Sequence, residues 1–151
     1  MKILGWNCRG MLSPTAVREL LDLQGRLRAD VVFLSESHLN KAKVIELKSK
    51  LGFDLLNIVE SDGRSCGLVM FYNLINDVVL NFSSQNFIDG PVMNCNSVAW
   101  RFTRFYGEPS WELKHQSRTA IRDLNKDTMG PRIIIKVFNE ILVSSEKKEV
   151  T

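Results

Sequence analysis

The chain has 151 residues, a formal net charge of +3 at pH 7, 44% hydrophobic residues and 25% charged residues. This length and apolar content suit one folded domain with its own core, and the mixture of charges argues against intrinsic disorder. No apolar run approaches the roughly 20 residues that a membrane-spanning helix needs, so we expect no membrane partner.

Two apolar segments near the N-terminus, Ile3–Gly10 and Val31–Ser37, are predicted strands that turn polar where each strand leaves the core. The first turns polar at Asn7, and the second carries Glu36 near its end. An amide and a carboxylate delivered side by side by neighbouring strands can hold a hard divalent cation beside a phosphate. The alternatives are a loop cap for Asn7 and a solvated strand-end acid for Glu36.

A helix is predicted between these two strands. Ser13 and Pro14 suit its N-cap and first helical position, and Leu12 is placed to form a hydrophobic staple with Val17. The apolar stripe of this helix comprises Val17, Leu20, Leu21 and Leu27. A strand, a helix and a strand in this order favour parallel pairing with a right-handed crossover.

The remaining elements alternate between helices and strands. A second helix is predicted over Lys41–Lys50 and ends at Gly52. Four β-like runs follow, and Asp62-Gly63 marks a hairpin turn between the first two: Phe53–Val59, Cys66–Tyr72, Val78–Phe82 and Val98–Phe105. A polar helix over Leu113–Lys126 and an Ile-rich strand, Ile133–Asn139, come last. This order indicates a mixed α/β layered domain.

Positive charge is concentrated in one part of the chain. Residues 101–136 carry eight basic side chains and four acidic ones, a local net charge of +4, which leaves −1 elsewhere. Such an excess suits a polyanion such as nucleic acid. A stripe on the predicted polar helix is either a contact for DNA phosphates or, as we favour, a solvated face: Lys114, Arg118, Arg122 and Lys126. Trp100 and Trp111 are candidate stacking platforms for bases, although burial is favoured for Trp100 inside a strand.

The three cysteines are widely spaced and odd in number: Cys8, Cys66 and Cys95. This pattern argues against a disulfide framework or a zinc site and favours a reducing, intracellular compartment. The sequence also begins on a strand-like segment without a charged-then-apolar leader, so secretion is not expected.

Four segments carry a resemblance to a known family: Trp6–Gly10, Phe33–Ser37, Gly63–Leu68 and Arg101–Pro109. In order and spacing they resemble the endonuclease/exonuclease/phosphatase superfamily, in the version found in plant non-LTR (LINE-type) retrotransposons. The segment Phe138–Lys148 continues the likeness, which covers nearly the whole chain but only the N-terminal part of the family's domain. The resemblance implies one C-terminally truncated domain over residues 1–151, a truncated four-layer α/β sandwich of two packed β-sheets flanked by helices.

The resemblance implies a role for each of four residues. Asn7 contacts the phosphate beside the metal, and Glu36 binds the metal, which is Mg²⁺. Tyr106 hydrogen-bonds the scissile phosphate, with a core or turn aromatic as its alternative, and Asn139 helps to stabilise the pentavalent transition state. In that family a His held by an Asp activates water for in-line attack, and the ion polarises the phosphate. DNA as a partner and nuclear residence are further implications.

The sequence departs from the family pattern at three places. Where family members have Gly-Asp-Phe-Asn, residues 136–139 are Lys-Val-Phe-Asn, and Val137 can neither accept a proton nor ligate a cation. Arg104 stands where a glycine is usual, and we expect it to crowd the pocket. No Ser-Asp-His motif follows, and the two histidines, His38 and His115, precede the altered strand end and are expected on the surface.

These departures predict weakened Mg²⁺ binding and no useful catalysis, because loss of a general base alone costs roughly 10² to 10⁴ in rate. Three functions stay open: an impaired remnant of a Mg²⁺-dependent phosphodiesterase that nicks DNA, a non-catalytic nucleic-acid-binding module, and a nuclease completed by another chain. No small-molecule cofactor is expected. Truncation would also expose apolar positions and unpaired strand edges.

Overall fold

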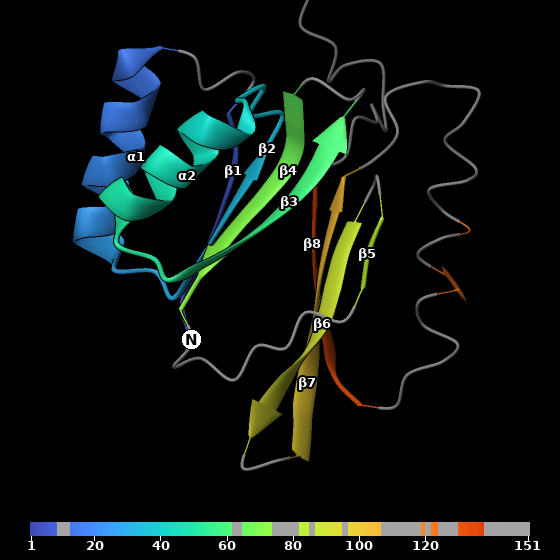
Figure 1. Cartoon of the computed structure of the whole chain (residues 1–151). Coiled ribbons are helices and arrows are strands. Elements are labelled where there is room, and N and C mark those ends of the chain that lie inside the picture. Colours follow the sequence, from blue (N-terminus) through green and yellow to red (C-terminus); the bar gives the residue numbers. More distant parts are fainter. Residues whose placement is uncertain are drawn as a thin grey trace, which may run out of the picture.

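Two four-stranded sheets pack face to face, and two helices cover the outer face of the first sheet (Figure 1). This arrangement comes from a computed structural model that describes residues 1–8, 13–61, 65–73, 82–84, 87–94, 97–106, 119, 122–123 and 130–137. Helices, first sheet and second sheet form three layers of the expected sandwich. The helix predicted over Leu113–Lys126 lies mostly outside the described residues, although Thr119, Arg122 and Asp123 are helical.

The first sheet has the strand order β1-β2-β4-β3. Its strands are β1 (Ile3–Asn7), β2 (Val31–Ser35), β3 (Leu55–Ser61) and β4 (Ser65–Tyr72). The pairing of β1 with β2 is parallel, and β4 pairs antiparallel with both β2 and β3. Both the parallel crossover unit and the β3–β4 hairpin predicted from the sequence are therefore confirmed.

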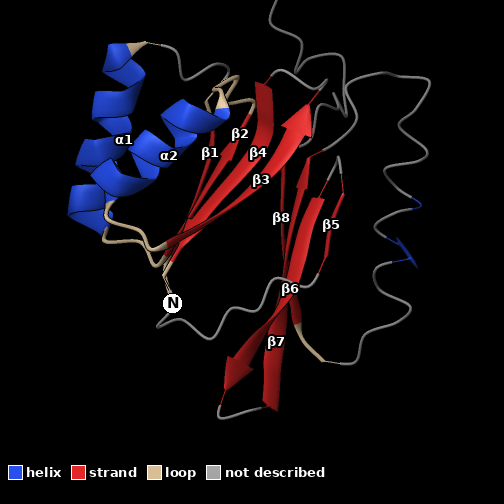
Figure 2. Cartoon of the chain, in the orientation of Figure 1, coloured by secondary structure: helices blue, strands red, loops and turns tan. Residues whose placement is uncertain are grey.

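The second sheet has the order β5-β6-β7-β8 and is drawn below and beside the first in Figure 2. Its strands are β5 (Phe82–Ser84), β6 (Phe87–Asn94), β7 (Ser97–Tyr106) and β8 (Arg132–Val137). The pairing of β7 with β8 is parallel, and the other two pairings are antiparallel. The strand predicted over 98–105 is confirmed as β7, and the strand predicted over 133–139 is confirmed as β8 as far as Val137, because residues 138 and 139 lie outside the described residues. Most of the run predicted over 78–82 lies outside the described residues, but Phe82 begins β5.

Strand β6 was not predicted, because its centre, Asp89-Gly90-Pro91, is typical of a turn. The tertiary structure overrides that local preference. Gly90 lies in register with Phe102 on β7, and the carboxylate of Asp89 is held by arginines of β7 and β8. These contacts keep the segment extended between β5 and β7.

Local capping signals set both helices. In α1 (Pro14–Leu27) the hydroxyl of Ser13 accepts a hydrogen bond from the Ala16 amide at 3.2 Å, as predicted for the N-cap. Helix α2 (Lys41–Leu51) ends at Gly52, whose φ of +77° is readily adopted by glycine. Neither described helix is long and apolar enough to cross a membrane.

The predicted apolar stripe of α1 is confirmed in part. Leu20 is fully buried against the sheet, and Val17 and Leu21 pack against the same core. Leu27, in contrast, is 44% exposed, so its assignment to the buried stripe was wrong. The reason is its position as the last residue of the helix, at the margin of the stripe, just before the chain turns at Arg28.

Successive side chains of β1 and β2 point to opposite faces of the first sheet. The core therefore has two parts, one under the helices and one between the two sheets. Leu34 faces the helices, whereas Val31 and Phe33 face the second sheet. Phe33 stacks on Phe102 of β7 with ring centroids 4.7 Å apart, and Trp100 packs edge-on against Phe102 at 6.4 Å. Trp100 is therefore partly buried against the core between the sheets, which confirms in part the burial expected at this position.

Candidate active site at the strand ends

The strands β1, β2, β7 and β8 have their carboxyl ends at the same edge of the sandwich. Phe33 and Ser35 on β2 contact Phe102 and Arg104 on β7, so the two strands run in the same direction across the interface between the sheets. Each of them is parallel to its neighbour, β1 or β8, and a Cβ on Gly5 of β1 would lie 3.5 Å from Ile135 of β8. The carboxyl ends of β1, β2, β7 and β8 therefore converge.

The structure brings Asn7 and Glu36 together at this edge, as the sequence predicted. Asn7 is the last residue of β1 and lies in register with Ser35, directly before Glu36. The Asn7 Nδ2 donates a hydrogen bond to Glu36 Oε1 at 3.3 Å. One amide and one carboxylate are thus placed side by side by two strand ends.

An unusual backbone conformation aims Glu36 at Asn7. Ser35 and Asn7 share one face of the sheet, so a Glu36 that continued the strand would point to the opposite face. Instead Glu36 has a φ of +54°, and its amide donates to the carbonyl of Gly67 at 2.9 Å. Left-handed backbone at a non-glycine residue is strained, and such strain is typical of functional sites. His38 also has a positive φ, +51°, and its side chain is exposed, as expected from the sequence.

The chain after β1 is fixed by Cys8. Both its amide and its Sγ donate to the carbonyl of Ser35, each at 3.1 Å. Cys8 forms no disulfide. These bonds continue the β1–β2 pairing one residue beyond Asn7 and hold the end of β1 against the turn that carries Glu36.

Arg104 reaches this site from the second sheet. It is only 2% exposed, and its Nη2 donates to Ser35 Oγ at 3.2 Å. Its Nε is buried without an acceptor. Burial lowers the pKa of the Arg104 guanidinium, but arginine remains protonated in proteins. The sequence predicted crowding by Arg104; the structure shows a buried cation on the same side of the sheet as Asn7.

The other two predicted site residues are described only in part. Tyr106 is the last residue of β7 and pairs in register with Val137 on β8 at the same edge. The structure describes the backbone of these two residues only. Asn139 lies outside the described residues, so its role stays a prediction.

Three arginines of the basic span have structural surroundings that the sequence did not reveal: Arg101, Arg104 and Arg132. Asp89 is 2% exposed and forms ion pairs with Arg101 Nη2 and, at 3.1 Å, with Arg132 Nη1. The Thr103 hydroxyl donates to the same carboxylate at 2.6 Å. Arg101 and Arg132 are therefore tied to the protein, which reduces the charge that this span can offer to a polyanion. The signal for this network was Asp89, an acid within an otherwise apolar segment.

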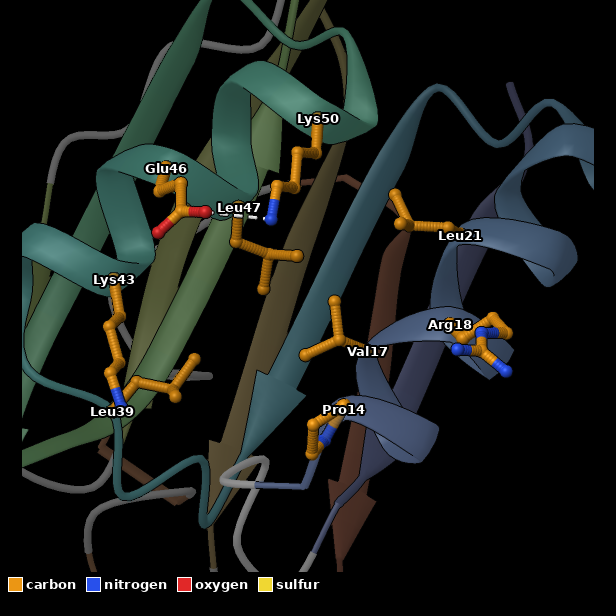
Figure 3. Close-up of a pocket in the computed structure, with 9 residues that line it drawn as sticks. All are labelled: Pro14, Val17, Arg18, Leu21, Leu39, Lys43, Glu46, Leu47 and Lys50. Carbon is orange, nitrogen blue, oxygen red and sulfur yellow. Dashed lines mark ion pairs between the residues drawn. The ribbon is translucent and has the colours of Figure 1, made fainter.

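A separate groove lies between α1 and α2 (Figure 3). Its volume is about 390 Å³, and Val17, Leu21 and Leu47 contribute apolar side chains to it. Glu46 and Lys50 form an ion pair across one turn of α2 at 2.7 Å on its rim. Neither Asn7 nor Glu36 lines this groove, so it is distinct from the strand-end site.

The strand-end residues make a poor site for the Mg²⁺ ion that the sequence resemblance implies. Among the described residues no three His, Cys, Asp or Glu side chains are grouped as metal ligands. Besides Glu36, the described residues place Glu60 of β3 at this edge, and Glu60 is paired with Lys41. Mg²⁺ is usually bound by one or two carboxylates together with substrate phosphates. The buried guanidinium of Arg104 adds a like charge close to such an ion. The donor set therefore does not fit a tightly held divalent cation.

No family model and no curated protein sequence matches the chain. Solved structures do match it. The endonuclease domain of TRAS1, a telomere-specific non-LTR retrotransposon, has a TM-score of 0.63 and 14% identity, over 91% of this chain and 58% of that domain. The 3′ phosphatase NExo from Neisseria, bound to a product DNA hairpin, has a TM-score of 0.66 and 17% identity, over 97% and 60%. A humanised D. rerio TDP2 has a TM-score of 0.65 and 18% identity, over 97% of this chain and 68% of that protein.

These structures share one architecture, the sandwich of the endonuclease/exonuclease/phosphatase proteins, and the chain has that fold. Identities this low establish the fold alone. The chain spans 58% to 68% of the length of the three structures. The predicted fold class is therefore confirmed.

Proposed function

We propose that this chain is a catalytically impaired relative of the Mg²⁺-dependent phosphodiesterases that nick DNA. The phosphodiesterase meant is the endonuclease of plant LINE-type retrotransposons. The observation that supports the proposal is the Asn7–Glu36 pair at 3.3 Å, at the edge formed by the carboxyl ends of β1, β2, β7 and β8. The fold is shared with a retrotransposon endonuclease domain and with a phosphatase bound to product DNA. DNA is the proposed partner.

In this proposal the site retains the residues that contact the phosphate and lacks those that prepare the attacking water. Glu36 would hold the metal ion, Asn7 would contact the phosphate beside it, and Tyr106 and Asn139 would steady the phosphate oxygens. A bound Mg²⁺ would polarise the phosphate. Val137 supplies no carboxylate at the end of β8, so the ion would be held weakly and no described residue would orient a base.

A nuclease completed by another polypeptide is the second candidate. The observation that favours it is the apolar surface of β8, the edge strand of the second sheet as far as the structure describes it. Ile133 and Ile134 of β8 are 48% and 44% exposed. Exposed apolar residues on an edge strand favour pairing with a further strand.

The test is nicking of supercoiled plasmid by the purified chain with Mg²⁺. We expect wild type and Glu36→Ala to give the same background, while both bind DNA in a salt-dependent manner. Glu46→Ala, which removes an exposed acid of α2, is the matched control. Nicking that is lost in Glu36→Ala but kept in Glu46→Ala would show that the chain is a competent enzyme.

A further inference from the structure

We propose that the strand-end site contains its own fixed cation, Arg104, and binds a phosphate group without a divalent metal ion. This inference rests on the proposed function only in taking the edge formed by β1, β2, β7 and β8 as the binding site. The ligand class is a phosphate oxyanion, either a free or terminal phosphate or a phosphate of the DNA backbone.

The first observation is that the described residues supply no counter-charge to Arg104. Arg104 is 2% exposed, and no carboxylate of the described residues forms an ion pair with it. Among those residues its guanidinium donates to one acceptor, Ser35 Oγ, and its Nε has none. Arg101, three residues earlier and on the opposite face of β7, is in contrast paired with Asp89. A buried charge is normally paired, because removing an ion from water without a partner is costly.

The second observation is the position of this cation. Its hydrogen-bond acceptor, Ser35, lies in register with Asn7 on the neighbouring strand and on the same face. Neighbouring strands lie about 4.8 Å apart, so one strand spacing separates the backbone of Asn7 from that of Ser35, the acceptor of the guanidinium. Arginine and amide N–H groups are the usual donors to phosphate oxygens, and the guanidinium fork can contact two oxygens together.

The same position explains why metal is not needed. A positive charge beside Glu36 disfavours a second cation there and favours an anion. The carboxylate of Glu36 competes with an incoming phosphate for the Asn7 amide, which already donates to it. Removal of the negative charge of Glu36 should therefore strengthen phosphate binding, whereas a metal-mediated site would lose binding.

The experiment is titration of the purified chain with inorganic phosphate in EDTA at low ionic strength, followed by ³¹P NMR and calorimetry. We expect binding in EDTA that Mg²⁺ does not strengthen, and weakening by about tenfold or more in Arg104→Met. Arg26→Met is the matched control. Arg26 is exposed on the last turn of α1, next to the start of β2, whereas the candidate site lies at the opposite end of that strand. Arg26→Met should bind phosphate like wild type. Glu36→Gln should bind more tightly.

Two results would overturn the inference: phosphate binding that requires Mg²⁺, or binding in EDTA that Arg104→Met leaves unchanged. If circular dichroism shows that Arg104→Met does not fold, phosphate binding by Arg104→Lys and by Glu36→Gln tests the inference instead. Retained binding in Arg104→Lys together with tighter binding in Glu36→Gln supports the fixed cation, and weaker binding in Glu36→Gln contradicts it. Oligonucleotides with and without a 5′-phosphate separate a terminal phosphate from the backbone as the source. Plasmid nicking reports on the proposed function independently.

Discussion

The side-chain amide of Asn7 donates to the carboxylate of Glu36 at 3.3 Å, although 29 residues separate them in the chain. Two features produce this contact. The parallel register of β1 and β2 ends both strands at the same level, and the left-handed backbone at Glu36 turns its side chain back toward Asn7. The contact therefore depends on the fold and on local strain together.

The strain at Glu36 predicts an unusual order of stability between two variants. Glu36→Gly should be about 1 kcal/mol more stable than Glu36→Ala, because glycine adopts the positive φ without a steric cost and alanine does not. Urea unfolding followed by circular dichroism measures the difference. The same pair at Glu46, on the exposed face of α2, should show the opposite order by about 1 kcal/mol. If the alanine variant is the more stable of the two at both positions, backbone strain at Glu36 is contradicted.

The buried carboxylate of Asp89 should be essential for the second sheet. Asp89→Asn leaves Arg101 and Arg132 without their counter-charge, so the free energy of unfolding should fall by roughly 3–5 kcal/mol. Glu60→Gln is the control, since it breaks an exposed ion pair with Lys41 and should cost no more than about 1 kcal/mol. Thermal or urea unfolding of both variants tests this, and similar losses would show that the Asp89 network is not stabilising.

Restoring a carboxylate at position 137 should strengthen metal binding. Val137 pairs with Tyr106 at the edge that holds Asn7 and Glu36, so Val137→Asp should raise Mg²⁺ affinity about tenfold or more, and more again when combined with Arg104→Gly. Titration calorimetry with Mg²⁺ measures this change. Ile134→Asp adds the same charge on an exposed position of β8 and should change the affinity little. Equal gains in Val137→Asp and Ile134→Asp would mean that net charge alone is responsible.

Tyr72 should make stability depend on pH in the alkaline range. Its partial burial raises the pKa of the phenol above the usual value of 10.0. The folded chain then holds this proton at pH values where the unfolded chain has lost it, so the contribution is complete below pH 10 and is lost as pH rises through the folded pKa. Urea unfolding at a series of pH values should show a smaller decline in Tyr72→Phe than in wild type. Identical declines would exclude this effect.

Much of the first half of the fold follows from local patterns. The caps Ser13 and Gly52 bound the two helices because side-chain hydrogen bonding and glycine's conformational freedom act over a few residues. The crossover rule then places β1 beside β2, and this is sufficient to bring Asn7 next to Glu36. The juxtaposition at the candidate site was predictable for that reason.

Only the tertiary structure decided the electrostatics of the site and the course of β6. Asp89-Gly90-Pro91 is a turn by local preference, yet it is extended because Asp89 is paired with arginines 12 and 43 residues away in the chain. Arg104 was one basic residue among eight, and its meaning depends on Ser35, 69 residues away on the other sheet. Charges and caps can be read along a chain, but whether a charge is buried, paired or exposed depends on contacts between distant segments, which no local pattern encodes.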